Sequence, residues 1–190
     1  TAGTEAAVHF LDEAAEHEIR VSAQNELGEG EASPLLPAST VEATARFDMG
    51  PAGSPVQEGF VQVTPETVYT EERGYGLADA GSVTAEDRGE DTDGDVARDL
   101  LRGHGSAYRM LVDLPDGAYT VVLTVGDATG SARTDIAVQG EDRSTVAVDQ
   151  GARQVIEPAE VTDGQLVLGI SGSGGQLNGV TIAADTTAGW

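Results

Sequence analysis

The sequence contains no lysine and no cysteine, and only 4% of its 190 residues are aromatic. Without cysteine the chain can form neither a disulfide framework nor a thiolate metal site. No apolar run approaches the ~20 residues that a transmembrane helix requires. The length suits one medium domain, or one domain with a fragment of another.

Positive charge is also scarce, because 33 Asp and Glu residues face 10 basic residues, all arginine, for a formal net charge of -23. Such a charge repels itself in dilute buffer, whereas molar salt shortens the Debye length to ~3 Å. The composition therefore predicts adaptation to concentrated salt. Disorder is disfavoured because the 39% hydrophobic residues fall in alternating runs. The same charge argues against nucleic acid and anionic membranes as partners.

Period-two alternation of apolar and polar residues runs through most of residues 40–182 and predicts many short strands. Pro115-Asp116-Gly117 and Asp163-Gly164 have the chemistry of hairpin turns. Helical character is confined to about one turn within Val96 to Leu101. This pattern predicts an all-β sandwich or barrel. The expected strands are Tyr108 to Leu114, Ala118 to Val125, Thr134 to Val138, Ser144 to Val148, Gln154 to Val161, Gln165 to Ile170 and Leu177 to Ile182.

The N-terminal segment, residues 1–36, has a different character. Ile19, Val21 and Ala23 alternate with polar residues, and Asn25 to Gly30 supplies a turn before a short second strand. The segment resembles the last part of a fibronectin type III domain, with His17 where that family usually has a tyrosine. Two or three strands cannot bury a core alone. We therefore expect the chain to begin within such a domain, as a piece or mature product; the alternative is that these strands dock on the main domain.

Residues 37–184 carry several motifs in a fixed order: Phe47-Asp48-x-Gly50, Arg73-Gly74-Tyr75-Gly76, Asp113-Leu114-Pro115-x-Gly117-x-Tyr119 and Leu177-Asn178-Gly179. In these motifs the segment resembles the module that accompanies rhamnogalacturonan acetylesterases (family 12 carbohydrate esterases) and related rhamnogalacturonan lyases. The resemblance implies a galactose-binding-like jelly-roll β-sandwich in a pectin-degrading context. Residues 185–190, which include Trp190, are expected to form a linker.

A catalytic site is not expected in this chain. Ala184-Asp185-Thr186-Thr187 only superficially resembles the Gly-Asp-Ser motif of the esterases, since the glycine and the serine are missing. A Ser-His-Asp triad also needs a histidine, and the sequence offers only His9, His17 and His104. His104 lies in a predicted exposed loop. The chain itself looks non-catalytic, which leaves its own enzymatic activity open, and the parent protein is expected to be a rhamnogalacturonan acetylesterase or lyase.

The best candidates for contact with a sugar are Tyr69 and Tyr75, which flank Arg73 in a glycine-containing loop. Arginine can bind a uronate carboxylate through two parallel hydrogen bonds. Arg88 and Asn178 are expected partners if their loops converge on the same end of the sandwich. In the alternative interpretation, Tyr69 and Tyr75 fill the core and Arg73 pairs with Glu71 or Glu72.

A run of acids from Glu90 to Asp95 contains the candidate metal ligands Asp91, Asp93 and Asp95. Alternate carboxylates in a loop can face one Ca²⁺ ion, which takes six to eight oxygen ligands. The run departs from the EF-hand pattern in its glycine position and lacks a closing glutamate. A solvated acidic loop is the favoured interpretation, and Ca²⁺ is the minority one.

Together these features predict a non-catalytic module of a secreted, halophilic, pectin-degrading enzyme. The module would bind the pectic polysaccharide or support the substrate cleft of the adjacent catalytic domain. The alternative is a structural spacer that packs on the catalytic domain and has no ligand of its own. Burial of Tyr69 and Tyr75 would favour the spacer, and their exposure would favour the binding module.

Overall fold

The computed structural model describes residues 15–25, 28–39, 42–78, 81, 83–89 and 95–185. The chain divides into two compact units, Thr1–Ala43 and Thr44–Trp190. Trp190 and the candidate ligands Asp91 and Asp93 lie outside the described residues. Within the described part of the chain, no helix has the length and apolar character needed to cross a membrane.

The first unit consists of two short antiparallel pairs. β1 (Glu16–Ile19) pairs with β4 (Leu36–Ser39), and β2 (Gln24–Asn25) pairs with β3 (Gly28–Glu29). None of this unit's side chains for which burial is described is buried, and Val21 is 70% exposed. Two-stranded pairs of this kind are marginally stable without a further apolar surface to cover them.

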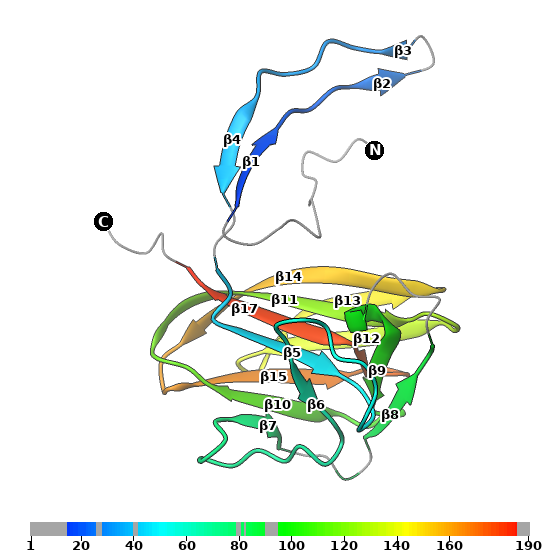
Figure 1. Cartoon of the computed structure of the whole chain (residues 1–190), viewed down its shortest axis with the longest axis vertical. Coiled ribbons are helices and arrows are strands. Elements are labelled where there is room, and N and C mark those ends of the chain that lie inside the picture. Colours follow the sequence, from blue (N-terminus) through cyan, green and yellow to red (C-terminus); the bar gives the residue numbers. More distant parts are fainter. Residues whose placement is uncertain are drawn as a thin grey trace. The chain divides into compact units, whose positions relative to one another are not determined.

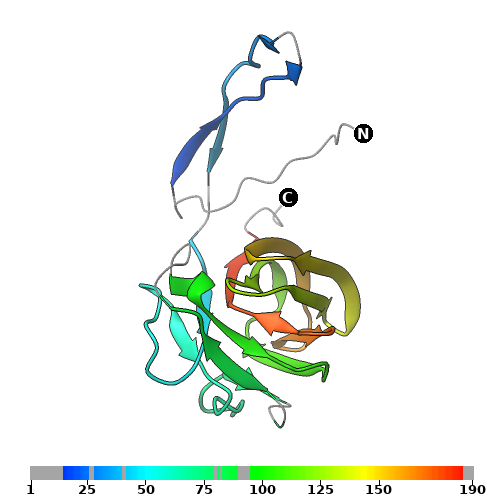
Figure 2. The same cartoon turned by 90° about the vertical axis from the view of Figure 1, so that its right-hand side faces the viewer.

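Two five-stranded sheets form the second unit (Figure 1). The first sheet has the order β14-β11-β17-β5-β6, and the second has the order β13-β12-β15-β10-β7. Figure 2 shows the two layers from the side. The first sheet contains β5 (Ala45–Met49), β6 (Val61–Val63), β11 (Gly117–Asp127), β14 (Gly151–Val161) and β17 (Gly179–Ala184). The second contains β7 (Tyr75–Leu77), β10 (Tyr108–Asp113), β12 (Ala132–Val138), β13 (Glu141–Val148) and β15 (Gln165–Ser171).

A small three-stranded sheet, of order β16-β9-β8, completes the unit. It comprises β8 (Thr84–Asp87), β9 (Asp99–Arg102) and β16 (Gln176–Leu177), and α1 (Asp95–Arg98) precedes β9 directly. The predicted helical turn is therefore present, but it covers only the first part of Val96 to Leu101. Asp99, Leu100 and Leu101 are buried strand residues instead.

Alternation of side chains builds the core between the two main sheets. In β15 the buried residues Leu166, Leu168 and Ile170 alternate with partly exposed ones, as expected for a half-buried strand. β10 repeats the pattern with Tyr108, Met110 and Val112 buried. One continuous apolar cluster joins these strands with β11 and β17. The predicted all-β sandwich is confirmed.

Both hairpins predicted from turn chemistry are wrong. β10 and β11 flank Pro115-Asp116-Gly117 but lie in different sheets, as do β14 and β15 around Asp163-Gly164. Each turn carries the chain from one layer to the other. A hydrogen bond joins the two turns, in which the amide of Gly164 donates to Asp116 Oδ1 at 2.9 Å. Turn residues specify a reversal of direction, whereas packing decides which sheet receives the next strand.

The hairpin of the second sheet is formed elsewhere, between β12 and β13. Val138 pairs with Glu141, so Gln139 and Gly140 form a two-residue loop. Their φ angles are 52° and 78°, the conformation of a type I′ turn, which suits the twist of paired strands. One edge of the first sheet is β14, which carries Pro158 opposite Thr120 of β11.

Candidate functional site

Three predicted site residues, Tyr69, Arg73 and Tyr75, come together beside β7, and we name them the loop cluster. A tight turn places them, because the amides of Arg73 and Gly74 both donate to the carbonyl of Thr70, at 3.0 and 2.9 Å. Gly74 has a φ of +73°, which glycine adopts at little cost. The turn returns the chain into β7 immediately after Arg73.

Each member of the loop cluster has a defined contact. Tyr69 Oη donates to both carboxylate oxygens of Asp113 at 3.0 Å. The guanidinium carbon of Arg73 lies 6.0 Å from the centre of the Tyr75 ring, within the range of a cation–π contact. Arg73 also donates from Nη1 to the carbonyl of Val68. No ion pair of Arg73 with Glu71 or Glu72 occurs among the described contacts.

Burial of the two tyrosines is intermediate. The centre of the Tyr75 ring lies 5.0 Å from that of Phe47, at the edge of the core. Tyr69 is also half-buried, and the hydrogen bond to Asp113 raises the pKa of its hydroxyl above the usual range. The tyrosines therefore neither fill the core nor stand free of it. One side of the cluster is anchored, and the exposed Arg73 is presented to solvent.

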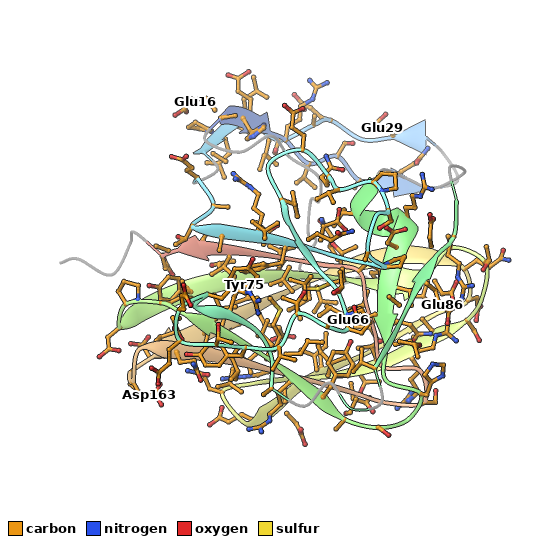
Figure 3. All side chains as sticks on the ribbon, turned by 60° about the horizontal axis from the view of Figure 1, so that its bottom comes forward. Glu16, Glu29, Glu66, Tyr75, Glu86 and Asp163 are labelled. Carbon is orange, nitrogen blue, oxygen red and sulfur yellow. The ribbon has the colours of Figure 1, made fainter. Side chains whose placement is uncertain are left out.

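Arg88 belongs to a different part of the molecule, an ion-pair network on the small sheet. Its Nε and Nη2 donate to Oδ1 and Oδ2 of Asp127 at 2.8 and 2.6 Å, and Nη2 lies 2.6 Å from Glu86. Arg102 binds the same Asp127 carboxylate. Figure 3 shows Glu86 well separated from Tyr75. The structure does not bring Arg88 to the loop cluster.

Asn178 is fully buried, with no exposed surface. Its Nδ2 donates to the carbonyl of Asp99 at 2.7 Å, and its backbone amide donates to Thr124 at 2.8 Å. These bonds tie β9 to the strands of the first sheet. The expectation that Asn178 and Arg88 converge with Tyr69, Arg73 and Tyr75 is therefore not met, and the described geometry gives Asn178 a framework role.

Two buried carboxylates near Asn178 escaped sequence reasoning. Asp48 and Asp99 are 2% and 1% exposed. Burial raises the pKa of Asp99 to about 6, and the charges of Asp87 and Asp48 add to the effect. Asp48 Oδ2 accepts the amide of Gln57 at 2.7 Å. Asp48 belongs to the motif Phe47-Asp48-x-Gly50, but nothing in the sequence distinguishes a buried aspartate from the many on the surface.

Most of the predicted calcium loop lies outside the residues that the structure describes. Asp91 and Asp93 are not among the described residues, and Asp95 begins α1 with only its backbone described. Among the residues that the structure does describe, no group of three or more acidic or histidine side chains is placed to hold a metal ion. Ca²⁺ at Asp91, Asp93 and Asp95 stays a prediction.

His104 occupies the exposed turn that the sequence predicts, with a φ of 49°. Its Nε2 lies 2.7 Å from the hydroxyl of Thr84, so the two form a hydrogen bond. Thr84 begins β8 of the small sheet, and the pair joins this strand to the turn after β9.

Comparison with known proteins places the second unit in a family. A model described as "Beta-agarase/YXIM esterase-like, galactose-binding domain-like" matches residues 45–184. The uncharacterized esterase YxiM of Bacillus subtilis (strain 168) is 31% identical over 124 residues, 65% of this chain and 31% of the relative. Beta-agarase A of Zobellia galactanivorans is 28% identical over 142 residues, 72% of this chain and 25% of the relative. The chain thus spans less than a third of either protein.

Solved structures show the same fold. The crystal structure of YXIM from Bacillus subtilis superposes with a TM-score of 0.60 at 23% identity, over 74% of this chain and 40% of the other. A beta-glucuronidase of Bacteroides uniformis superposes with a TM-score of 0.57 at 14% identity, over 94% of this chain and 23% of the other. The family model alone spans well over half of the sequence, and the chain therefore belongs to the beta-agarase/YXIM esterase-like, galactose-binding domain-like family.

Proposed function

We propose that this chain is a non-catalytic, carbohydrate-binding module of a longer, secreted polysaccharide-degrading enzyme. The loop cluster is the observation that carries the proposal. On one short stretch of chain it holds an aromatic ring, a guanidinium whose carbon lies 6.0 Å from the centre of that ring, and a tyrosine hydroxyl that donates to the distant Asp113 carboxylate. Rings of this kind pack on the C–H faces of sugars, while guanidinium and carboxylate groups bind hydroxyls.

The relatives support a place beside a catalytic domain. The chain matches only 31% of the esterase and 25% of the agarase, so most of each relative lies outside the matched module. The names of both relatives describe enzymes. We place the module in an enzyme that acts on rhamnogalacturonan or another pectic glycan, since the motifs around Phe47, Arg73 and Asn178 resemble that group. The net charge of -23 supports operation in concentrated salt.

A structural spacer is the second candidate, and one observation favours it. Tyr75 packs on Phe47, and Arg73 donates to the carbonyl of Val68, so part of the loop cluster serves the protein itself. In that case Arg73 would fix the turn before β7, and the exposed surface of the cluster would bind no glycan.

Retention on immobilised glycans in molar KCl separates the two functions. The columns carry rhamnogalacturonan, galactan, homogalacturonan or agarose. Arg73→Ala removes the guanidinium, and Tyr69→Phe removes only the hydroxyl that binds Asp113. Arg153→Ala, on β14 of the other sheet, is the control for the lost charge. Retention that falls in Arg73→Ala and not in Arg153→Ala supports the binding module. A folded protein that no column retains supports the spacer.

A further inference from the structure

The outward face of the second sheet carries a band of small and polar side chains. The inward residues of β12 and β15 are buried, which leaves Arg133, Asp135 and Ala137 of β12 on the outer face. Ser171 of β15 stands opposite Asp135, and Gly169 stands opposite Ala137. Because paired strands place these residues side by side, two parallel rows cross the sheet.

One of the two rows forms a depressed floor. Gly169 and Ala137 occupy its middle, and Gly169 has no side chain to fill the space; a β-carbon there would lie 3.2 Å from that of Ala137. Arg109 of β10 lies beyond Gly169, and Asp142 of β13 lies beyond Ala137. The row thus runs from a cationic end to an anionic end across four strands.

A β-bulge shapes one wall of this depression. Ile136 pairs with Ser144, whereas the next residue, Ala137, pairs with Asp142, so Arg143 has no residue opposite it. Bulges of this kind re-aim a side chain and often lie at binding sites. Arg143 lines the depression, and it also lies 3.0 Å from Glu141.

Two adjoining hollows occupy the band. One, of about 400 Å³, is lined by Arg133, Arg143, Thr145 and their neighbours; the other, of about 220 Å³, reaches Arg109 and Gly169. Asp135, Ile136, Asp142 and Ser171 line both, so the two hollows lie next to each other. The larger one lies within the range of about 300–1,000 Å³ that is usual for small-molecule sites.

We propose that this groove, which we name the sheet groove, binds an acidic segment of a glycan, one that carries uronate carboxylates or sulfate esters. The inference rests on the proposed function as a carbohydrate-binding module and assigns a second contact surface, separate from the loop cluster.

The positive charge of the arginines that line the sheet groove favours an acidic ligand. The lining holds three arginines (Arg109, Arg133 and Arg143) and two carboxylates (Asp135 and Asp142), whereas the whole chain has 10 basic residues against 33 acids. An anionic polymer therefore meets less repulsion here than the composition of the whole chain would give. Arg133 lies 3.8 Å from Asp135 at a side-chain exposure of 56%, which leaves its donors accessible to a ligand. Arginine binds carboxylate and sulfate groups through paired hydrogen bonds, which persist in salt better than long-range attraction does.

Isothermal titration in molar KCl tests the assignment. The ligands are an oligogalacturonide, a sulfated galactan oligosaccharide and a neutral galactan oligosaccharide of equal length. Arg133→Gln with Arg143→Gln removes two cations from the groove, and Gly169→Val fills its floor. Arg20→Gln with Arg153→Gln removes two cations elsewhere and serves as the matched control. Circular dichroism and the thermal midpoint establish that each variant is folded.

We expect the wild type to bind at least one acidic oligosaccharide more tightly than the neutral one. The groove variants should weaken that binding about tenfold or more, with no comparable change in the control. Tighter binding of the oligogalacturonide would identify a uronate ligand, and tighter binding of the sulfated galactan oligosaccharide would identify a sulfate ester. Equal affinity for the neutral oligosaccharide, or equal weakening in the control, overturns the acidic ligand. Groove variants that bind like the wild type while Arg73→Ala fails to bind overturn the groove alone; a wild type that binds no glycan overturns the proposed function as well.

Discussion

Arg88 holds the carboxylate of Asp127 through two parallel hydrogen bonds, Nε to Oδ1 at 2.8 Å and Nη2 to Oδ2 at 2.6 Å. The Asp127 side chain is only 2% exposed, and the amide of Thr129 donates to it at 3.0 Å. Burial alone would raise the pKa of Asp127, but Arg88, the Thr129 amide and Arg102 outweigh it and hold the pKa below the usual range. The pair joins the loop after β8 to the end of β11.

Loss of this pair should be costly. Arg88→Ala leaves the buried Asp127 carboxylate with Arg102 as its only guanidinium partner among the described contacts. We expect the free energy of unfolding to fall by about 2–3 kcal/mol, since the buried charge of Asp127 is then only partly compensated. Urea unfolding at pH 7 in fixed salt measures the change. Arg153→Ala, an exposed site, should stay within about 0.5 kcal/mol. A loss below about 1 kcal/mol in Arg88→Ala would contradict the assignment.

Asp99 should respond to pH in the opposite sense from Asp127. Burial raises the pKa of Asp99 to about 6, above the unfolded value of about 3.9. Its contribution to stability is therefore complete below about pH 4 and is lost as the pH rises through about 6. Asp99→Asn should raise the unfolding free energy at pH 8 by about 3 kcal/mol, with little effect at pH 4.

The matched comparison is Asp127→Asn. Its lowered folded pKa stabilises the protein above the unfolded pKa, and that contribution is lost only as the pH falls through the lowered value. Asp127→Asn should therefore destabilise at pH 8, where Asp99→Asn stabilises. Urea unfolding of the two variants at pH 4, 6 and 8 shows both trends. If both variants changed the unfolding free energy in the same direction at pH 8, the two aspartates would not have the opposite environments that we describe.

Gly126 permits the close approach of β11 and β14. A β-carbon at Gly126 would lie 2.2 Å from the carbonyl oxygen of Gly151 and 2.6 Å from the α-carbon of Ala152. Gly126→Ala should lower the unfolding free energy by about 2 kcal/mol or more, because the obstacle is backbone. Gly164→Ala is the control, with a φ of +78° and open space around it, and should cost about 1 kcal/mol. A smaller loss at Gly126 than at Gly164 would count against the pairing.

Salt should stabilise the whole protein. With a formal net charge of -23, self-repulsion is strongest in dilute buffer and is screened in molar salt. We expect the thermal midpoint to rise by about 10 °C between 0.1 and 2 M KCl, as a gain of a few kcal/mol implies for a chain of this length. Differential scanning calorimetry measures the rise, and an uncharged osmolyte at equal osmolality controls for solvent exclusion. A flat or falling midpoint would remove the proposed adaptation to brine.

The sequence predicts the strands of the second unit well, because a half-buried strand leaves its alternation in the residues themselves. It does not predict how the strands connect. Pro115-Asp116-Gly117 marks a turn correctly, yet the partners of β11 are β14 and β17, and Val161 of β14 pairs with Gly117 from far along the chain. Sheet membership depends on packing between layers, which local turn chemistry does not encode.

The candidate site can be predicted only in part from the sequence, because some of its contacts join residues that lie far apart along the chain. Tyr69, Arg73 and Tyr75 lie close in sequence, and one tight turn brings them together. The contact of Tyr69 with Asp113 spans 44 residues and has no local signal. Arg88 and Asn178 look like plausible surface ligands in the sequence, but their roles depend on the burial of Asp127 and Asp99. The fibronectin-like origin of the first unit stays a prediction.

Pro158 has a consequence for the behaviour of many copies of the module. It lies in β14, one of the two edge strands of the first sheet, where an open row of backbone groups could pair with a neighbouring molecule. Proline offers no amide to such a neighbour, and the exposed Glu160 follows two residues later. The edge is thereby capped against strand addition. Molecules crowded on a polymer surface can thus bind and dissociate separately, because this edge does not join their sheets into fibres.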